Sequence, residues 1–513
     1  MADFEHLFSV LVDNHPFLAL KARVEGYEWA SHHDEFASVV RQTKNNAEFA
    51  VAIKTILSYI NNGHTAVADP LVTTCVPRPE VIDEAYWALW EAQYAGIDPE
   101  VAERWWKLSN KESDGAKDTM TCVYALYSSG RYVVVGASPS LRDKVDILSG
   151  LHVETVNGQD VHAYVASLRG TEWLKYDPIR KRLYQSSLPL PRDQVDIGLA
   201  TPDGDATEIR SPGLTAPYSM VYSRPPFLNS AMMKAPNART EGSLCGCILG
   251  GDVGYLRVPG MTLWSLTEVL AKETSMLKDF FHEIKDLPAL IIDIRGNGGG
   301  QDLAWYRLVS LLASEEVRMD FAHVMRRGDL VRPFADYLEK TMGTDSILDC
   351  DLTGLPPEVT SDAYRDPVRS TMSFVPDPES VHYRGKVFLL VDDRVYSSAE
   401  NFAAFCKGSG WATLVGEPTG GDGLGFNLII HRLPNSGLVV KFPMALGLNP
   451  DMTANEEMHT MPDILVEPSI EDLMKAAYWR PSGQPDPATD AVLRRCLELA
   501  RSNSMAEGDP NGR

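Results

Sequence analysis

The chain has 513 residues, which is too long for a single hydrophobic core and favours roughly two to four domains. Its formal net charge of −22 argues against nucleic acid as a partner, because proteins that bind phosphate backbones concentrate Lys and Arg. The same charge disfavours an anionic membrane surface, and no apolar run is long enough to span a bilayer. We therefore expect a multidomain protein with neither a nucleic-acid nor a membrane partner.

The cysteines and the N-terminus bear on the compartment and on metal binding. The 7 cysteines are scattered and odd in number, which argues against a disulfide framework and favours a reducing environment. Only Cys245 and Cys247 lie close together, and no second Cys or His pair stands at a spacing that would complete a zinc site. The segment Met1–His6 is acidic and polar, unlike a signal peptide. We expect a cytoplasmic protein without a metal or other cofactor, while noting that a chain trimmed of its leader would look the same.

Residues 1–115 are predicted to form a mainly helical region. Apolar side chains recur at helical spacing from Phe4 to Leu11 and again from Phe49 to Ile56. The second of these helices ends before Asn61-Asn62-Gly63-His64, where Asn-Asn-Gly favours a tight turn. A helical pattern anchored by four tryptophans continues from Pro79 to Trp106.

Residues 116–210 change to the pattern of a small strand-rich domain. Strand-like runs at Val123–Tyr127 and Tyr132–Val135 are separated by Ser-Ser-Gly. The run Ile147–Val156 then leads through an Asn-Gly turn into a short helix over Val161–Leu168. Strands joined by tight turns, followed by a short helix, are typical of small independent domains.

Residues 211–480 are predicted to form an α/β unit. After a Pro-rich, loop-like stretch, apolar strand-like runs alternate with helical patterns, which is typical of a mainly parallel sheet covered by helices. The principal strand-like runs are Gly254–Val258, Ala289–Ile294 and Gly385–Asp393, and shorter ones follow up to Val466. Residues 340–380 are rich in Pro, Asp and Ser and favour a long loop. Residues 481–513 are expected to hold a terminal helix and a frayed tail.

Two strand-to-helix turns carry groups that suit acyl-transfer chemistry. The first is the glycine-rich run Gly296–Gly300, which a phosphate-binding loop would follow with Lys-Ser/Thr, absent here. It is therefore either a plain tight turn or an oxyanion hole. The second holds Ser397 and Ser398, where the alternatives are an ordinary helix N-cap and an exposed nucleophile. A serine nucleophile needs a histidine base, and the 12 histidines alone do not single one out.

Several ordered motifs, covering about residues 50–475, resemble the C-terminal-processing (tail-specific) serine peptidase family. Asp293–Gly300 is similar to its Asp-x-Arg-x-Asn-Gly-Gly-Gly motif, and Ser397–Glu400 is similar to its nucleophile turn. Leu414–Gly423 resembles its Gly-Glu-Pro-Thr-x-Gly-Lys-Gly segment. Pro462-Asp463, preceded by Glu456, resembles its C-terminal Glu-x-x-Gly-x-x-Pro-Asp motif, and Asn62–Thr65 resembles its Asp-Gly-His-Thr.

The resemblance implies roles for particular residues. The lysine that acts as general base in one branch of the family is replaced by Asp422, so a Ser-Lys dyad is excluded. The tricorn-core-like branch uses Ser, His and Glu, which implies Ser397 as nucleophile, His64 as base and Glu456 as the carboxylate that orients the imidazole. Glu457 stays open as an alternative to Glu456. The amides of Gly298, Gly299 and Ser398 are the implied oxyanion donors. His459, which replaces the family's glycine, is interpreted as a residue at the surface or at the rim of the site.

The leading hypothesis is a serine endopeptidase that hydrolyses polypeptides through an acyl-enzyme intermediate. The resemblance also implies that residues 116–210 are a PDZ-like domain, a class that binds chain ends by strand addition. The alternative is a catalytically silent protein that binds a peptide or an apolar ligand on the same scaffold. A thioesterase- or lipase-like hydrolase is disfavoured because no Gly-x-Ser-x-Gly elbow surrounds Ser397. The oligomeric state is left open, a homo-oligomer included.

Overall fold

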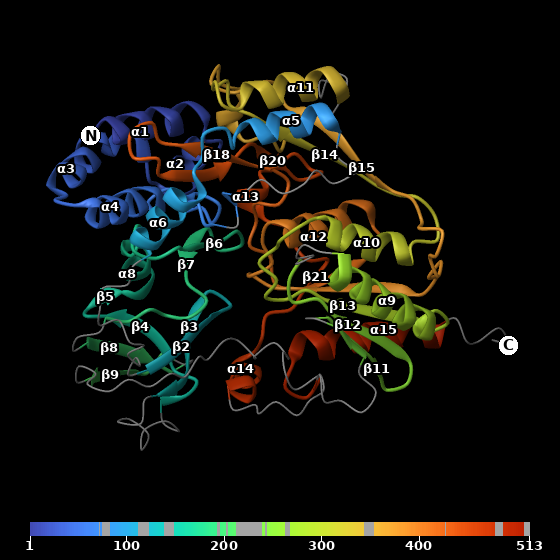
Figure 1. The fold of residues 1–513 in the computed structure, drawn as a ribbon. Helices are drawn as coiled ribbons and strands as arrows, with labels where there is room; N and C mark the ends of the chain where they lie inside the picture. The colour runs from blue at the N-terminus through green and yellow to red at the C-terminus, as the bar shows by residue number, and fades with distance from the viewer. Residues whose placement is uncertain are drawn as a thin grey trace.

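The computed structural model describes residues 1–70, 72–73, 83–110, 123–137, 148–191, 195–201, 204–211, 239–241, 244–261, 267–342, 353–425, 427–477 and 486–506. Figure 1 shows a layer of N-terminal helices, a small antiparallel sheet below it, and a larger α/β unit beside both. The structure is thus of the mixed α/β class. None of the described helices has the length and apolar character needed to cross a membrane.

The N-terminal region is helical, as the sequence predicts. Its described elements are α1 (Ala2–Asn14), α2 (Leu18–Glu25), η1 (Trp29–His32), α3 (His33–Gln42), α4 (Asn46–Ser58), α5 (Glu84–Ala92) and α6 (Pro99–Ser109). The helical pattern predicted over Pro79–Trp106 is confirmed in its described part, where it forms two helices, α5 and α6. Gly96 adopts a left-handed φ of 77° between them. Asp98 then caps a new helix that begins at Pro99.

The N-terminal helices share a hydrophobic core with strands from late in the chain. These strands are β18 (Leu428–Arg432) and β19 (Val439–Pro443), and the short β1 (Ala66–Val67) adds to their edge. β1 pairs antiparallel with β19, with Val67 opposite Val440. Phe4, Ile53 and Phe442 belong to one fully buried cluster that spans both parts of the chain. The turn that holds His64, just ahead of β1, is thereby fixed against the larger unit.

The small domain is built on an antiparallel sheet with strand order β2-β3-β4-β8-β9, to which β5 adds at β4. Its elements are β2 (Val123–Ser128), β3 (Arg131–Ala137), β4 (His152–Val156), β5 (Gln159–Asp160), α8 (Val161–Ser167), β8 (Val195–Ala200) and β9 (Ala206–Ser211). Inward-facing apolar residues of the sheet pack on Val161 and Val165 of α8. A separate hairpin of β6 (Lys175–Asp177) and β7 (Arg182–Tyr184) reaches from this domain toward the centre of the molecule (Figure 1).

The larger unit surrounds a sheet with strand order β10-β11-β12-β13-β16-β17-β21. These strands are β10 (Arg239–Glu241), β11 (Leu244–Leu249), β12 (Val253–Arg257), β13 (Ala289–Asp293), β16 (Lys386–Val391), β17 (Thr413–Gly416) and β21 (Ile464–Leu465). The pairings from β12 through β21 are parallel, whereas β10, β11 and β12 pair antiparallel at one edge. The parallel run directs the carboxyl ends of β13 and β16 to the same edge of the sheet, where the two predicted strand-to-helix turns lie.

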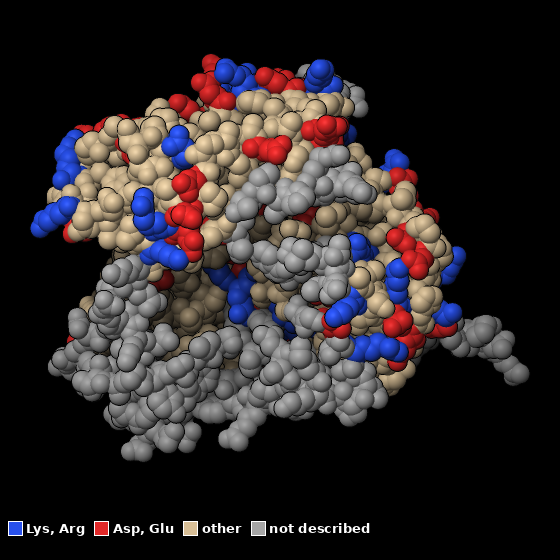
Figure 2. Space-filling model, in the orientation of Figure 1, with Lys and Arg blue, Asp and Glu red and all other residues tan. Residues whose placement is uncertain are grey.

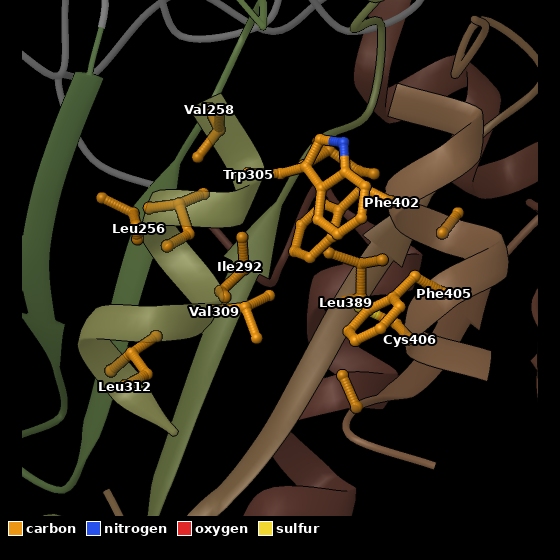
Figure 3. Close-up of a cluster of buried hydrophobic side chains, with 14 of the residues drawn as sticks. Leu256, Val258, Ile292, Trp305, Val309, Leu312, Leu389, Phe402, Phe405 and Cys406 are labelled. Carbon is orange, nitrogen blue, oxygen red and sulfur yellow. The ribbon is translucent and has the colours of Figure 1, made fainter. Parts of the chain in front are cut away.

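Alternating side chains of the central strands enter two different cores. One face packs on α9 (Thr267–Ile284), α10 (Leu303–Leu312) and α12 (Ser398–Ser409), and Figure 3 shows Ile292 and Leu389 on this side with Trp305 and Phe402. The other face, which includes Ile291 and Leu390, packs on the terminal helix α15 (Ala491–Ala506). The strands are therefore buried on both faces, which explains their continuous apolar sequences.

Further elements complete the structure around the sheet. They are β14 (Val317–Val324), α11 (Arg332–Met342), η5 (Pro357–Thr360), β15 (Val368–Phe374), β20 (Leu446–Leu448), α13 (Asn455–Met458) and α14 (Ile470–Ala477). β14 pairs with both β15 and β20. The long loop predicted for residues 340–380 is wrong over 368–374, because the polar residues of β15 alternate on the exposed face of a regular antiparallel pair. Residues 343–352 lie outside the described part.

The aromatic stack that joins α10 to α12 should be a main source of stability. Trp305 and Phe402 are both fully buried, with ring centroids 5.4 Å apart in a stacked arrangement. We expect Phe402→Ala to lower the free energy of unfolding by about 3–5 kcal/mol, because it removes transfer free energy and leaves a cavity. Denaturant titration measures the change. Val375→Ala, which truncates a side chain that is 65% exposed, should change it by less than about 0.5 kcal/mol, and an equal effect of both variants would contradict the packing argument.

Candidate active site

Ser397 lies at the turn between β16 and α12, as the sequence predicts. It occupies the N-cap position of α12 with φ 58° and ψ −126°, a region that residues other than glycine rarely adopt. The glycine-rich loop touches it, because a Cβ on Gly299 would lie 2.7 Å from the Cβ of Ser397. Tyr396 N–H donates to the carbonyl of Asn297 at 3.1 Å, which ties the two turns together. The strained serine is thus held by the adjacent glycine-rich loop.

The turn after α4 brings His64 to this serine. His64 Nε2 lies 2.9 Å from Ser397 Oγ, although 333 positions separate the two residues in the sequence. The side chain of Asn62 fixes the turn from within, since its Oδ1 accepts the N–H of His64 and the hydroxyl of Thr65, both at 3.0 Å. The predicted proximity of the imidazole and the hydroxyl is therefore present.

The carboxylate that contacts the imidazole is Asp422. Its Oδ2 lies 2.6 Å from His64 Nδ1 and also accepts hydrogen bonds from Asn62 Nδ2 at 2.8 Å and from the Tyr396 hydroxyl at 2.9 Å. Its side chain is only 3% exposed. Burial by itself would raise the pKa of this carboxyl, but the neighbouring imidazole and the hydrogen bonds it accepts lower the pKa below its ordinary value. Asp422 therefore presents a buried negative charge to the ring.

The prediction that Glu456 contacts the imidazole is wrong. Glu456 forms an ion pair with Lys21 of α2 at 2.7 Å, and it reaches the site only through Asn62 Nδ2, which lies 3.3 Å from it. Burial raises the pKa of Glu456 to about 7, with Lys21 lowering it and the nearby Asp422 adding to the rise. The alternative, Glu457, is also elsewhere, because it pairs with Arg23 at 2.6 Å.

His459 is buried rather than at the surface. Only 5% of it is exposed, and burial lowers its pKa to about 4. It lies against Gly421, since a Cβ there would be 2.9 Å from the imidazole Cδ2 of His459. The expectation of a surface residue failed because the neighbouring loop of Asp422 folds over it. The imidazole is thus a packing support for that loop.

The three predicted oxyanion donors differ in whether their N–H groups already donate a hydrogen bond within the protein. The N–H of Gly299 donates to the side chain of Asn297 at 2.9 Å and is thereby occupied. Gly298 faces open space, since a Cβ added there would meet nothing within 4 Å. The amide of Ser398 belongs to the first turn of α12, where N–H groups have no partner within the helix. Gly298 and Ser398 are the donors that this geometry leaves available.

Glu400 is a buried support that the sequence analysis noted only as part of a motif. Its carboxylate accepts hydrogen bonds from Asn455 Nδ2 at 2.8 Å and from the Thr460 hydroxyl at 2.6 Å. Asn455 in turn accepts the N–H of Gly423 at 3.0 Å. This chain of contacts connects the first turn of α12 to the residue that follows Asp422. It explains why an acidic residue stands three positions after the serine.

The polar groups around Ser397 suit acyl transfer. Within the described ranges, no group of three or more His, Cys, Asp or Glu side chains is arranged to hold a metal ion. Cys245 and Cys247 are buried in β11 as free thiols. The arrangement combines a hydroxyl, an imidazole and a carboxylate beside the backbone amides of the glycine-rich loop and of the first turn of α12.

Comparison with known proteins shows a family match for part of the chain and several similar structures. Residues 252–466 match peptidase family S41. The structure is similar to mature CPAF, with 15% identity over 98% of this chain and 97% of that chain and a TM-score of 0.55. It is also similar to mature CPAF complexed with lactacystin (16% identity, 98% of both chains, TM-score 0.54). The photosystem II D1 C-terminal processing protease matches at 15% identity over 94% of this chain and 97% of that chain, with a TM-score of 0.34.

The family match includes Ser397, Asp422 and the glycine-rich loop, whereas His64 lies ahead of it in the sequence. The similarity to CPAF, which extends over nearly the whole chain, shows a shared fold that includes the N-terminal helices. The chain therefore contains a peptidase family S41 domain and is a serine-type peptidase.

Proposed function

We propose that the protein is a serine endopeptidase with Ser397 as nucleophile, His64 as general base and Asp422 as the carboxylate that orients the base. The observation that carries the proposal is the continuous line of contacts Ser397 Oγ–His64 Nε2 at 2.9 Å and His64 Nδ1–Asp422 Oδ2 at 2.6 Å. Asp422 replaces Glu456 in the role expected from the family resemblance.

Acylation follows from this geometry. The imidazole removes the hydroxyl proton of Ser397 as the oxygen attacks the carbonyl carbon of the scissile peptide bond. Asp422 accepts a hydrogen bond from the Nδ1–H of His64, which keeps Nε2 available as the base and stabilises the imidazolium that forms. The imidazolium then donates its proton to the leaving amine. Water, activated by the same imidazole, hydrolyses the acyl-enzyme.

The tetrahedral oxyanion would be stabilised by the amides of Gly298 and Ser398. Each such donor typically contributes about 3 kcal/mol to the stability of the transition state. Because Gly299 already donates to Asn297, its part is to let the loop approach Ser397, where a side chain would collide. The first turn of α12 adds a positive dipole end at the same point.

We also propose that the small antiparallel domain is PDZ-like and engages polypeptide substrates. The antiparallel sheet with α8 packed on one face supports this assignment. Strand addition to an open sheet edge would provide the binding mode.

Removal of the nucleophile tests the proposed reaction directly. We expect Ser397→Ala to lower kcat/KM on a denatured protein substrate by roughly 10⁴-fold or more. The same variant should lose covalent labelling by a fluorophosphonate, as measured by mass spectrometry. Persistent labelling of the variant would remove Ser397 from this role, whereas Ser398→Ala, one residue along, should keep the label.

Isosteric substitutions show which carboxylate, Asp422 or Glu456, orients the imidazole of His64. Asp422→Asn should lower kcat by about 10⁴-fold, because an amide stabilises the wrong imidazole tautomer. Glu456→Gln keeps a group that accepts from Asn62 and should lower kcat by less than about tenfold. Steady-state kinetics on one peptide substrate measure both variants. A larger loss of kcat in Glu456→Gln than in Asp422→Asn would assign the orienting role to Glu456.

The raised pKa of Glu456 predicts a pH-dependent stability. The folded protein, in which this pKa is about 7, binds the proton more tightly than the unfolded chain with its ordinary value of 4.5. The resulting contribution is fully present below about pH 4.5 and is lost as the pH rises through about 7. The free energy of unfolding of Glu456→Gln, compared with that of the wild type at the same pH, should therefore rise by on the order of 1–3 kcal/mol from about pH 5 to pH 8.

Urea denaturation at both pH values measures this gain. Glu457→Gln removes an adjacent carboxylate that pairs with the more exposed Arg23, and it controls for the loss of one negative charge. A Glu456→Gln variant that loses stability relative to the wild type over this interval would contradict the prediction.

A further inference from the structure

A short segment of the small domain is bound to both loops that form the active site. The N–H of Leu174 donates to the side chain of Asn61 at 2.8 Å, three residues ahead of His64. Lys175 Nζ donates to the carbonyl of Asp393 at 2.9 Å and lies 3.1 Å from its carboxylate, four residues ahead of Ser397. Residues 173–175 therefore lie where the histidine turn and the serine turn meet.

The same segment is held further by the β6–β7 hairpin. The Tyr184 hydroxyl and the Ser186 hydroxyl both donate to Asp393 Oδ2, at 3.0 and 2.9 Å. The carbonyl of Trp173 accepts from the side chain of Gln185. In Figure 1 this hairpin extends away from the small sheet toward the N-terminal helices and α13. Its backbone is thus fixed relative to the serine turn.

Trp173 is the side chain of this segment that remains in solvent. It is 45% exposed, whereas Leu174 is 2% exposed and the side chain of Lys175 is 11% exposed. Its ring meets Tyr396 edge-on, with centroids 5.4 Å apart, and Tyr396 immediately precedes Ser397. The ring of Tyr396 also lies 5.0 Å from that of His64. The ring of Tyr396 thus lies between the exposed indole of Trp173 and the imidazole of His64.

Exposure of so large an apolar group loses hydrophobic stabilisation unless a ligand covers it. Tryptophan is also the residue type that most often dominates binding when a partner buries it. Figure 2 shows this face of the molecule hollowed below the N-terminal helices, in the region of the β6–β7 hairpin of Figure 1.

We propose that Trp173 determines substrate specificity by packing on an apolar, preferably aromatic, side chain close to the scissile bond. The proposal rests on the peptidase function proposed above. An extended chain advances about 3.3 Å per residue. A substrate bond at Ser397 thus places a side chain one or two residues away beside the Trp173 ring, which contacts the neighbour of that serine.

The test compares two peptides that differ only in one residue beside the scissile bond, Phe in one and Ala in the other. The wild type should prefer the Phe peptide, and Trp173→Ala should lower kcat/KM for it by roughly ten- to hundredfold while changing the Ala peptide by less than about threefold. Trp173→Phe should restore most of the preference. The rate of fluorophosphonate labelling of Ser397 should stay unchanged in both variants, because that reagent carries no such side chain.

Val375→Ala serves as the control, since it truncates an exposed apolar side chain immediately after β15. An equal loss on both peptides would overturn the proposal and assign Trp173 a structural role, as would an unchanged preference in Trp173→Ala. If the fluorophosphonate labels Ser397 of the wild type but the enzyme shows no preference between the two peptides, the inference about Trp173 alone is overturned. A wild type that is neither labelled nor active on either peptide overturns the proposed function together with it.

Discussion

The active site depends on the attachment of the N-terminal chain to the late strands of the larger unit. His64 stands two residues ahead of β1, whose register opposite β19 is set by only two residue pairs. So short a strand cannot be stable by itself. The position of the imidazole therefore follows from the burial of α1 and α4 against β18 and β19, in the cluster that contains Ile53 and Phe442. Hydrophobic packing far from Ser397 supplies the free energy that brings the proposed catalytic groups together.

The distribution of buried charges explains why Asp422, rather than Glu456, contacts the imidazole. The ammonium of Lys21 is shared between Glu25 and Glu456, at 2.7 Å from each. Glu456 thereby has a cationic partner that compensates its charge. Asp422 instead accepts hydrogen bonds from the neutral side chains of Asn62 and Tyr396, so its charge is available to an imidazolium. Asn62 links the two carboxylates and fixes the His64 backbone at the same time.

Much of this arrangement could be predicted from the sequence, and the exceptions have a common cause. The strand-turn-helix at Ser397 and the histidine turn follow local rules of periodicity and turn chemistry, and the resemblance of their motifs identifies both residues. Asp422 was interpreted only as a replacement of the family's lysine, because its role depends on an imidazole 358 positions away in the sequence. A carboxylate between two glycines, after the nucleophile helix, is the signal that could have identified it. His459 was misplaced for the same reason, since the loop that buries it belongs to another motif.

Two ion pairs join the small domain to segments near the proposed active site, one in the loop before Ser397 and one at the end of α2. Lys175 contacts Asp393 beside the serine turn, and Arg169 contacts Glu25, which shares Lys21 with Glu456. Ion pairs of this kind contribute little net stability, because separation of the domains would return each charge to water. They do exclude other orientations, in which a buried charge would lack its partner. The small domain is therefore held partly by residues that adjoin the turns of Ser397 and His64, so a change in its docking must also affect the groups proposed to carry out the chemistry.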